Sequence, residues 1–262
     1  MRGIFVTGTD TNVGKTVVAA ALMLRYRDEV SLRYWKPVQT GIRPSTRSGR
    51  PETLQGRDSG IGIRTPDDRA SSDDDTTEVA RLSRTSEAQI LRCGVRLPDP
   101  VSPHLAAQRV GTRITVRDLI AMQREVEHAP TPESRIRNPE SRPRWVVEGA
   151  GGVLVPINER ETMADLMQAL DLPVVIAARS TLGTINHTCM TIEVLRRRML
   201  RVAGVVMVGE PNDENRLAIE RYGAAEVIAQ LPRFDPLTPE ALEAWARAEF
   251  DRSGVLFVGA LR

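Results

Sequence analysis

Short runs of apolar, β-branched residues alternate along the chain with longer segments whose apolar positions recur every three or four residues. The longer segments predict helices at residues 15–26, 185–199 and 212–222. The short runs predict six strands, at residues 4–7, 32–36, 145–148, 173–177, 202–208 and 227–231. Strands without polar alternation are typical of burial on both faces. The pattern therefore predicts an α/β fold with a doubly wound, mostly parallel sheet.

Two stretches interrupt this alternation. Residues 43–74 are almost free of apolar side chains and rich in Arg, Ser, Gly, Pro and Asp, and residues 129–144 contain PESR twice, seven residues apart. Neither stretch has apolar area to offset the entropy of ordering it. We expect two flexible insertions in surface loops of a single domain spanning residues 1–262, with a partner-binding tail or lid as the alternative.

Composition narrows the function classes. Lys+Arg is 36 against Asp+Glu 34, a net charge of +2, so charge gives no reason to expect a nucleic-acid or membrane partner. No apolar run approaches the roughly 20 residues that span a bilayer, and no long apolar segment follows the N-terminus. Two cysteines exclude a disulfide framework. A cytoplasmic protein is expected.

The sharpest motif is GTDTNVGKT at residues 8–16, between the first predicted strand and the first predicted helix. Consecutive backbone N–H groups and a helix N-terminus attract phosphate there, Lys15 adds a cation, and the Thr16 hydroxyl can ligate Mg²⁺. Five residues separate Gly8 from Gly14, where the usual motif has four. A chance GKT sequence is the alternative, but the flanking strand and helix favour a P-loop NTPase fold.

GTDTNVGKT resembles the GTDTxVGKT loop of the dethiobiotin synthetase family. Four further blocks resemble that family in the same order: WKPVQTG at 35–41, VSPH at 101–104, VEGAGG at 147–152 and LGTINH at 182–187. Together the blocks cover most of the chain outside the two expected insertions. The resemblance implies an ATP-dependent ligase that joins CO₂ to 7,8-diaminononanoate and closes a cyclic urea, releasing ADP and phosphate. It also implies a homodimer.

The resemblance implies a catalytic set of Lys15, Lys36 and Thr11. A carbamate of one amine would attack the γ-phosphate to give a carbamic–phosphoric mixed anhydride, which the second amine would then open. Such chemistry asks the protein mainly to position groups and to stabilise charge. Two cations at Lys15 and Lys36 suit that task.

Magnesium is the implied cofactor, and it prefers oxygen ligands. Thr16 supplies one, and Glu148, at the end of a predicted buried strand, is the natural second. The family's third ligand is an Asp that heads a helix, for which Asp73, Asp74 and Asp75 compete. Asp75 fits best, and it also has the character of a helix N-cap.

The remaining implied contacts are with substrate and nucleotide. The substrate would meet Thr11, Lys36 and Thr40, while Gly183, Thr184 and Asn186 open a helix whose N-terminus suits the carboxylate of a substrate bound to the second subunit. The base would lie near Val208 and Gly209, with Asn212 or Asn215 as substitutes for the family's usual Asn. The full nucleotide set comprises Asn12, Val13, Gly14, Lys15, Thr16, Val17, Asp75, Glu148, Gly149, Ala150, Gly151, Val208, Gly209, Leu231, Pro232 and Arg233.

Three alternatives stay open. An amidoligase of the same fold would need a glutaminase domain, for which the chain has no spare length. A partner-regulated ATPase switch typically carries a second lysine near the start of the loop, where this chain has Thr9 and Asp10. A degraded homologue is the third, because one expected insertion abuts the presumed metal ligand Asp75.

Overall fold

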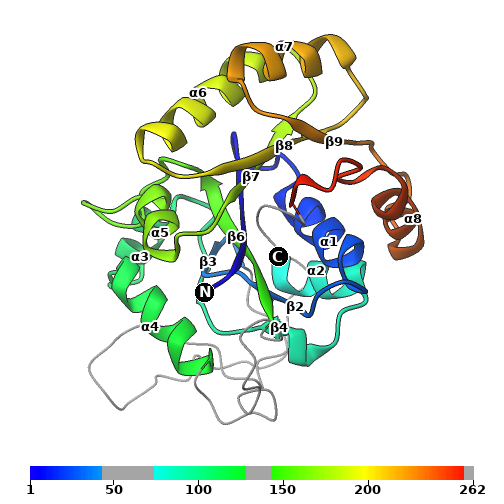
Figure 1. The fold of residues 1–262 in the computed structure, drawn as a ribbon. Coiled ribbons are helices and arrows are strands. Elements are labelled where there is room, and N and C mark those ends of the chain that lie inside the picture. The colour runs from blue at the N-terminus through cyan, green and yellow to red at the C-terminus, as the bar shows by residue number, and fades with distance from the viewer. Residues whose placement is uncertain (43–73, 128–142, 257–262) are drawn as a thin grey trace.

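The computed structural model describes residues 1–42, 74–127 and 143–256. Seven parallel strands form the central sheet in the order β4-β2-β6-β1-β7-β8-β9 (Figure 1). The strands are β1 (Gly3–Gly8), β2 (Leu32–Trp35), β4 (Ile90–Leu91), β6 (Arg144–Gly152), β7 (Val174–Arg179), β8 (Val202–Val208) and β9 (Val227–Leu231). The predicted doubly wound parallel sheet is confirmed.

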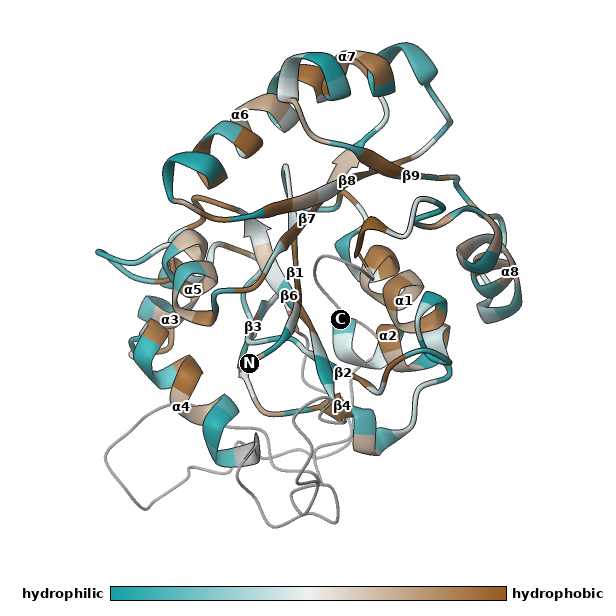
Figure 2. Cartoon of the chain, in the orientation of Figure 1, coloured by the Kyte–Doolittle hydropathy of each residue, from teal (hydrophilic) through white to brown (hydrophobic). Residues whose placement is uncertain are grey.

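Helices cover both faces of this sheet (Figure 1). One face carries α1 (Lys15–Arg25), α2 (Asp75–Ser83) and α8 (Pro239–Glu249). The other carries α3 (Pro103–Arg109), α4 (Val116–Glu127), α5 (Met163–Leu170), α6 (Thr184–Arg197) and α7 (Asp213–Gly223). Figure 2 shows hydrophobic residues concentrated on α1 and the central strands. Strand β1 serves both layers, since Phe5 packs on one face and Ile4 and Val6 on the other.

The six predicted strands are all present, and their ends differ by a few residues. Strand β2 ends at Trp35, so Lys36 lies just beyond it, at the carboxyl edge of the sheet. The sequence pattern did not predict β4, the short helix η1 (Glu87–Gln89), or a separate two-stranded sheet of β3 (Val38–Thr40) and β5 (Val95–Leu97). These elements are too short for periodicity to reveal them.

The predicted insertions lie largely outside the described residues. The residues at their approximate ends, Asp74 and Arg144, are buried, Asp74 as the N-cap of α2 and Arg144 as the first residue of β6, so the ordered structure begins at or before these positions. Across the three described ranges, no helix combines the length and hydropathy needed to span a bilayer.

Candidate active site

The loop between β1 and α1 is shaped by two residues in left-handed conformations. Asn12 has a φ of 54°, and Gly14, the N-cap of α1, has a φ of 89°. Within the described chain no side chain caps the first turn of α1, so its N–H groups and positive dipole end can meet an anion. A Cβ on Gly14 would lie 2.9 Å from Cγ1 of Val208, so glycine suits both the conformation and the space.

This loop forms one wall of a cavity of about 450 Å³ at the carboxyl ends of β1, β2 and β6. In a doubly wound sheet this edge is where ligands bind. Apart from Gln39, every lining residue is one that the sequence analysis assigned to nucleotide, metal or substrate. The lining is Thr11, Asn12, Gly14, Lys15, Thr16, Val17, Lys36, Gln39, Thr40, Asp75, Glu148, Ala150 and Gly151.

This cavity is lined by both lysines of the chain, Lys15 and Lys36. All the other residues among the 36 Lys+Arg are arginines. Lys15 is the first residue of α1, and its Nζ donates to the carbonyl of Asp10 at 2.8 Å. Burial, followed by the charge of Lys36, lowers the pKa of Lys15 from 10.5 to about 8. The site therefore holds two ammonium groups close enough to influence each other.

Lys36 is held between two carboxylates. Its Nζ lies 2.5 Å from Oε1 of Glu148 and 2.7 Å from Oδ2 of Asp75, and only 3% of its side chain is exposed. Burial alone would lower the pKa of Lys36, but Glu148 and then Asp75 outweigh it and raise that pKa above 10.5. Lys36 is therefore protonated near neutral pH and held by two ion pairs.

The backbone of Lys36 is also anchored. Nη1 of Arg96 donates to the Lys36 carbonyl at 2.9 Å, and a Cβ on Gly94 would lie 2.6 Å from that same oxygen. The close approach of the Gly94 segment explains why a glycine stands there. The small sheet of β3 and β5 thus fixes the start of the segment that follows Lys36.

Three side-chain oxygens from separate elements converge beside Lys36. The hydroxyl of Thr16 on α1 lies 3.1 Å from Oδ1 of Asp75 on α2 and 3.2 Å from Oε1 of Glu148 on β6. Burial would raise the pKa of Asp75, but the charge and hydrogen bond of Lys36 lower it below 3.8. One hydroxyl and two carboxylates form the hard oxygen set that Mg²⁺ prefers, so these residues fit that ion.

Asp74, and not Asp75, is the N-cap of α2, so the prediction of Asp75 as the cap is wrong. The Asp74 side chain accepts from the backbone N–H of Thr76 at 3.1 Å. Asp75 is the first helical residue, which leaves its carboxylate available to the cavity. Asp73, the remaining candidate, lies outside the described residues.

Sequence reasoning missed two residues that contact Asp75 and Glu148. Oε1 of Gln39 accepts the backbone N–H of Asp75 at 3.2 Å. The hydroxyl of Tyr34 donates to Oε2 of Glu148 at 2.7 Å, in a fully buried contact. Gln39 stands inside the block at 35–41, and Tyr34 precedes Lys36 by two positions, the spacing that places strand residues on one side. Either signal could have found them.

A second hollow of about 390 Å³ adjoins the cavity, and Thr11 contributes to both. Its lining is largely apolar and comes from the β1–α1 loop, the chain after β6 and helix α6: Thr9, Asp10, Thr11, Gly152, Val153, Leu154, Val155, Pro156, His187, Met190, Thr191 and Val194. Leu154 and Met190 are exposed there, as is Leu182 before α6. In an isolated chain these apolar side chains would be exposed to water, which is energetically unfavourable.

The residues predicted to hold a substrate carboxylate lie at the start of α6. Gly183 is its N-cap, with a φ of 93°, and Asn186 is exposed. The hydroxyl of Thr184 is buried against that of Thr188 at 3.4 Å, so it faces the protein interior. None of the three lines either hollow as the described residues form it. The structure therefore does not bring them together with Lys15 and Lys36 within one chain.

The residues predicted for the base lie at the ends of β8 and β9. The N–H of Gly209 donates to the carbonyl of Leu231 at 2.9 Å, which ties the two strand ends together. Of Val208, Gly209, Leu231, Pro232 and Arg233, none is among the described residues that line the 450 Å³ cavity. The proposed substitutes are engaged elsewhere: Asn212 caps α7 through the N–H of Asn215, and Nδ2 of Asn215 donates to the carbonyl of Ser180 at 2.9 Å.

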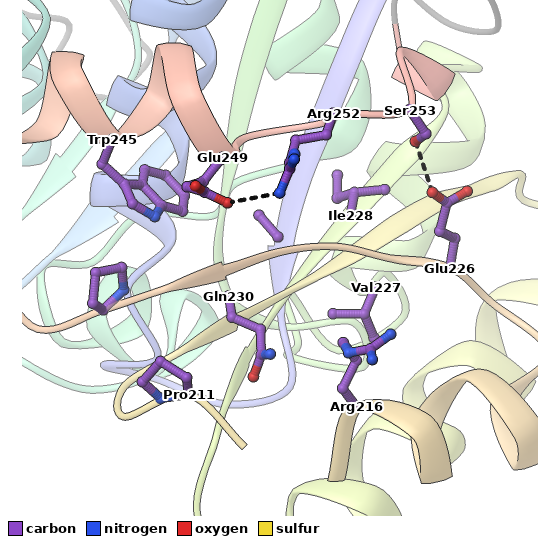
Figure 3. Close-up of a pocket in the computed structure, with 12 residues that line it drawn as sticks. Pro211, Arg216, Glu226, Val227, Ile228, Gln230, Trp245, Glu249, Arg252 and Ser253 are labelled. Atoms are coloured by element: carbon purple, nitrogen blue, oxygen red, sulfur yellow. Dashed lines mark hydrogen bonds and ion pairs between the residues drawn. The ribbon is translucent and has the colours of Figure 1, made fainter. Parts of the chain in front are cut away.

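Pro232 instead lines a groove of about 550 Å³ along the outer edge of β9 (Figure 3). Side chains from α7, β9 and α8 surround it, including Trp245 and the ion pair of Arg252 with Glu249 at 3.5 Å. No residue of the 8–16 loop contributes to this groove as the described chain forms it. It is a separate feature from the lysine-lined cavity.

The sequence is similar to those of known proteins. Residues 2–241 match the family model described as an AAA domain. The chain is 42% identical to the ATP-dependent dethiobiotin synthetase BioD of Paramagnetospirillum magneticum, over 91% of both chains. It is 35% identical to the protein of the same name from Agrobacterium fabrum, over 97% of both chains. It is also 38% identical to the biotin biosynthesis bifunctional protein BioCD of Bordetella avium, over 94% of this chain and 43% of that protein.

Proposed function

The chain belongs to the ATP-dependent dethiobiotin synthetases, and from that premise we propose that it converts 7,8-diaminononanoate, CO₂ and ATP into dethiobiotin, ADP and phosphate. One observation carries the proposal: both lysines of the chain, a threonine hydroxyl and two carboxylates line one cavity beside a phosphate-type loop. Phosphoryl transfer needs fixed cations around the transferred group and a reaction partner held in line with it. Lys15 and Lys36 would supply the cations, and the 450 Å³ cavity would hold the reaction partner.

The proposed reaction proceeds on the substrate's own atoms. One amine adds to CO₂ and forms a carbamate, and a carbamate oxygen attacks the γ-phosphorus while the bond to ADP breaks. The second amine then attacks the carbonyl carbon of the mixed anhydride, phosphate leaves, and the ring closes. The protein supplies no covalent partner, so its contribution is orientation and electrostatic stabilisation.

Lys15 and Lys36 carry most of that stabilisation in this proposal. Lys15, at the N-terminus of α1, would contact the β- and γ-phosphates, and Lys36, from the opposite wall, would contact the carbamate and the γ-phosphate. The ion pairs of Lys36 with Glu148 and Asp75 hold its ammonium in place before substrate binds. A preorganised cation loses little reorganisation energy when charge develops beside it.

Thr16, Asp75 and Glu148 would hold Mg²⁺. When bound, the ion would supply positive charge to the phosphate oxygens. The Thr16 hydroxyl already lies 3.1 Å from Oδ1 of Asp75 and 3.2 Å from Oε1 of Glu148, which supports the assignment. Backbone groups of Asn12, Val13, Gly149, Ala150 and Gly151, together with Val17, would complete the phosphate and ribose contacts. The base would lie between the segments at Val208–Gly209 and Leu231–Arg233.

The diamine would enter beside Thr11 and Thr40, with its aliphatic part in the adjoining apolar hollow. A homodimer would cover the exposed Leu154, Leu182 and Met190 and would bring the α6 N-terminus of the second subunit, with Gly183, Thr184 and Asn186, to the substrate carboxylate. The hydroxyl of Thr184 is turned inward and its backbone N–H donates to the Thr181 carbonyl at 3.1 Å, so we assign this contact mainly to Gly183 and Asn186.

Mass spectrometry of the product tests the proposal. Purified protein is mixed with 7,8-diaminononanoate, bicarbonate and MgATP, and each component is omitted in turn. We expect dethiobiotin only from the complete mixture, and its loss in the Lys36→Met variant. ATP hydrolysis without dethiobiotin would instead favour a partner-regulated ATPase. Nucleotide binding with neither product nor hydrolysis would indicate a degraded homologue.

A further inference from the structure

The buried face of Glu148 is occupied by a tyrosine that none of the family motifs includes. The hydroxyl of Tyr34 donates to Oε2 of Glu148 at 2.7 Å, and neither residue is exposed. In this contact the phenolic O–H donates and the carboxylate oxygen accepts. Tyr34 therefore acts as a hydrogen-bond donor toward this carboxylate.

The two oxygens of Glu148 have separate partners. Oε1 lies 2.5 Å from Nζ of Lys36 and 3.2 Å from the hydroxyl of Thr16, while Oε2 contacts Tyr34. A carboxylate can rotate about its terminal bond, which has a broad torsional preference. The bond from Tyr34 restrains that rotation, because turning the group would break the phenolic hydrogen bond in a site that lacks water contact.

We propose that Tyr34 is a positioning residue that orients Glu148 toward the metal ion. This inference rests on the proposed function for the identity of the metal-binding set Thr16, Asp75 and Glu148. Groups that hydrogen-bond a metal ligand commonly change metal affinity 10- to 100-fold when they are removed. Loss of the Tyr34 hydroxyl should leave the residues around it packed as before, since the ring remains in Tyr34→Phe.

The chain contains a matched control at a distance from the site. Tyr26 is also buried and also donates its hydroxyl to a buried carboxylate, that of Asp251. Asp251 accepts in addition from the backbone N–H groups of Val255 and Leu256, both at 3.0 Å, so this pair holds the segment after α8. Tyr26→Phe therefore removes the same kind of contact without touching Glu148.

The Mn²⁺ affinity of the full-length protein is measured at low temperature in the presence of saturating ADP. The free ion is quantified by its electron paramagnetic resonance signal. We expect Mn²⁺ to bind about tenfold more weakly, or worse, to Tyr34→Phe, and within about twofold of wild type to Tyr26→Phe. With MgATP, turnover of Tyr34→Phe should fall while the KM for the diamine stays unchanged. Thermal unfolding of both variants reports the structural cost separately.

Equal Mn²⁺ affinity in wild type and Tyr34→Phe would overturn the inference, as would an equal loss in both variants, which would show a purely structural role. The absence of Mn²⁺ binding to wild type would overturn it too. If wild type binds Mn²⁺ but makes no dethiobiotin, the proposed function fails, while the role of Tyr34 in metal binding is still decided by the two variants.

Discussion

Replacing Lys36 with methionine tests how the site holds two carboxylates together. Met retains most of the side-chain volume and removes the charge. In the wild type the Lys36 ammonium contacts Glu148, whose side chain is 1% exposed, and Asp75, whose side chain is 32% exposed. Without it, Glu148 becomes a buried charge whose remaining hydrogen bonds among the described residues come from neutral groups, Tyr34 and Thr16, while Lys15 acts on it through space. Solvent screens Asp75 better, so we assign most of the cost to Glu148.

Breaking a buried ion pair by removing one partner costs about 3–5 kcal/mol. For a chain of this size, 1 kcal/mol corresponds to about 2–4 °C in Tm. We therefore expect Lys36→Met to unfold roughly 6–20 °C below wild type when magnesium and nucleotide are absent. The assay is calorimetry or urea unfolding near pH 7, with chelator present.

The double variant Lys36→Met/Glu148→Gln is the decisive comparison. Removing both charges leaves no uncompensated carboxylate at the buried position, so the double variant should regain a large part of the lost stability. If the double variant is no more stable than Lys36→Met, or if Lys36→Met unfolds with wild type, the account of Lys36 as the counter-ion of Glu148 is wrong.

The pH dependence of this loss has a defined sign. Lys36 lowers the folded pKa of Asp75 below 3.8, so that stabilisation is present above the unfolded pKa and is lost as pH falls through the folded value. The folded pKa of Lys36 is raised above 10.5, so its stabilisation is present below 10.5 and is lost at still higher pH. The gap in stability between wild type and variant should be full from about pH 5 to 10 and should shrink toward pH 3.

Three further predictions concern neighbouring features. Acetic anhydride should modify Lys15 with a midpoint near pH 8 and leave Lys36 unmodified. At pH 8 about half of the Lys15 amines are neutral, whereas only about 0.3% of the amines of an ordinary lysine are. Peptide mass spectrometry measures the labelling of both lysines, and equal labelling would contradict the lowered pKa of Lys15. Gly14→Ala should lose roughly 1–3 kcal/mol of stability and most nucleotide affinity, since its Cβ would lie 2.9 Å from Val208. Gly111→Ala, with a φ of 70° but open space around it, is the control for conformational strain alone. Leu182→Glu should convert the proposed dimer to a monomer in light scattering, because Leu182 is fully exposed in the single chain. A mass that is dimeric in both proteins would place the subunit contact elsewhere.

Local sequence determined much of this protein. The phosphate loop needs a strand, glycines in tight conformations, a lysine and a helix start, and all of these are contiguous in residues 8–16. The six main strands were predictable because strands buried on both faces are continuously apolar. Lys36 and Glu148 were predicted for the site from the resemblance of the blocks at 35–41 and 147–152 to a known family, and the structure places Lys36 just after β2 and Glu148 within β6.

Tertiary structure decided which groups act together. Asp74 and Asp75 are adjacent and chemically identical, and only the start of α2 makes one a cap and the other a cavity carboxylate. The contact of Tyr34 with Glu148 joins strands 114 residues apart in sequence, and no local pattern encodes the distance between them. The inward turn of Thr184 likewise depends on its neighbour Thr188 and on the packing of α6. Residue type and spacing fix the available chemistry, but the orientation and pKa of each group depend on burial and on partners that only the folded chain supplies.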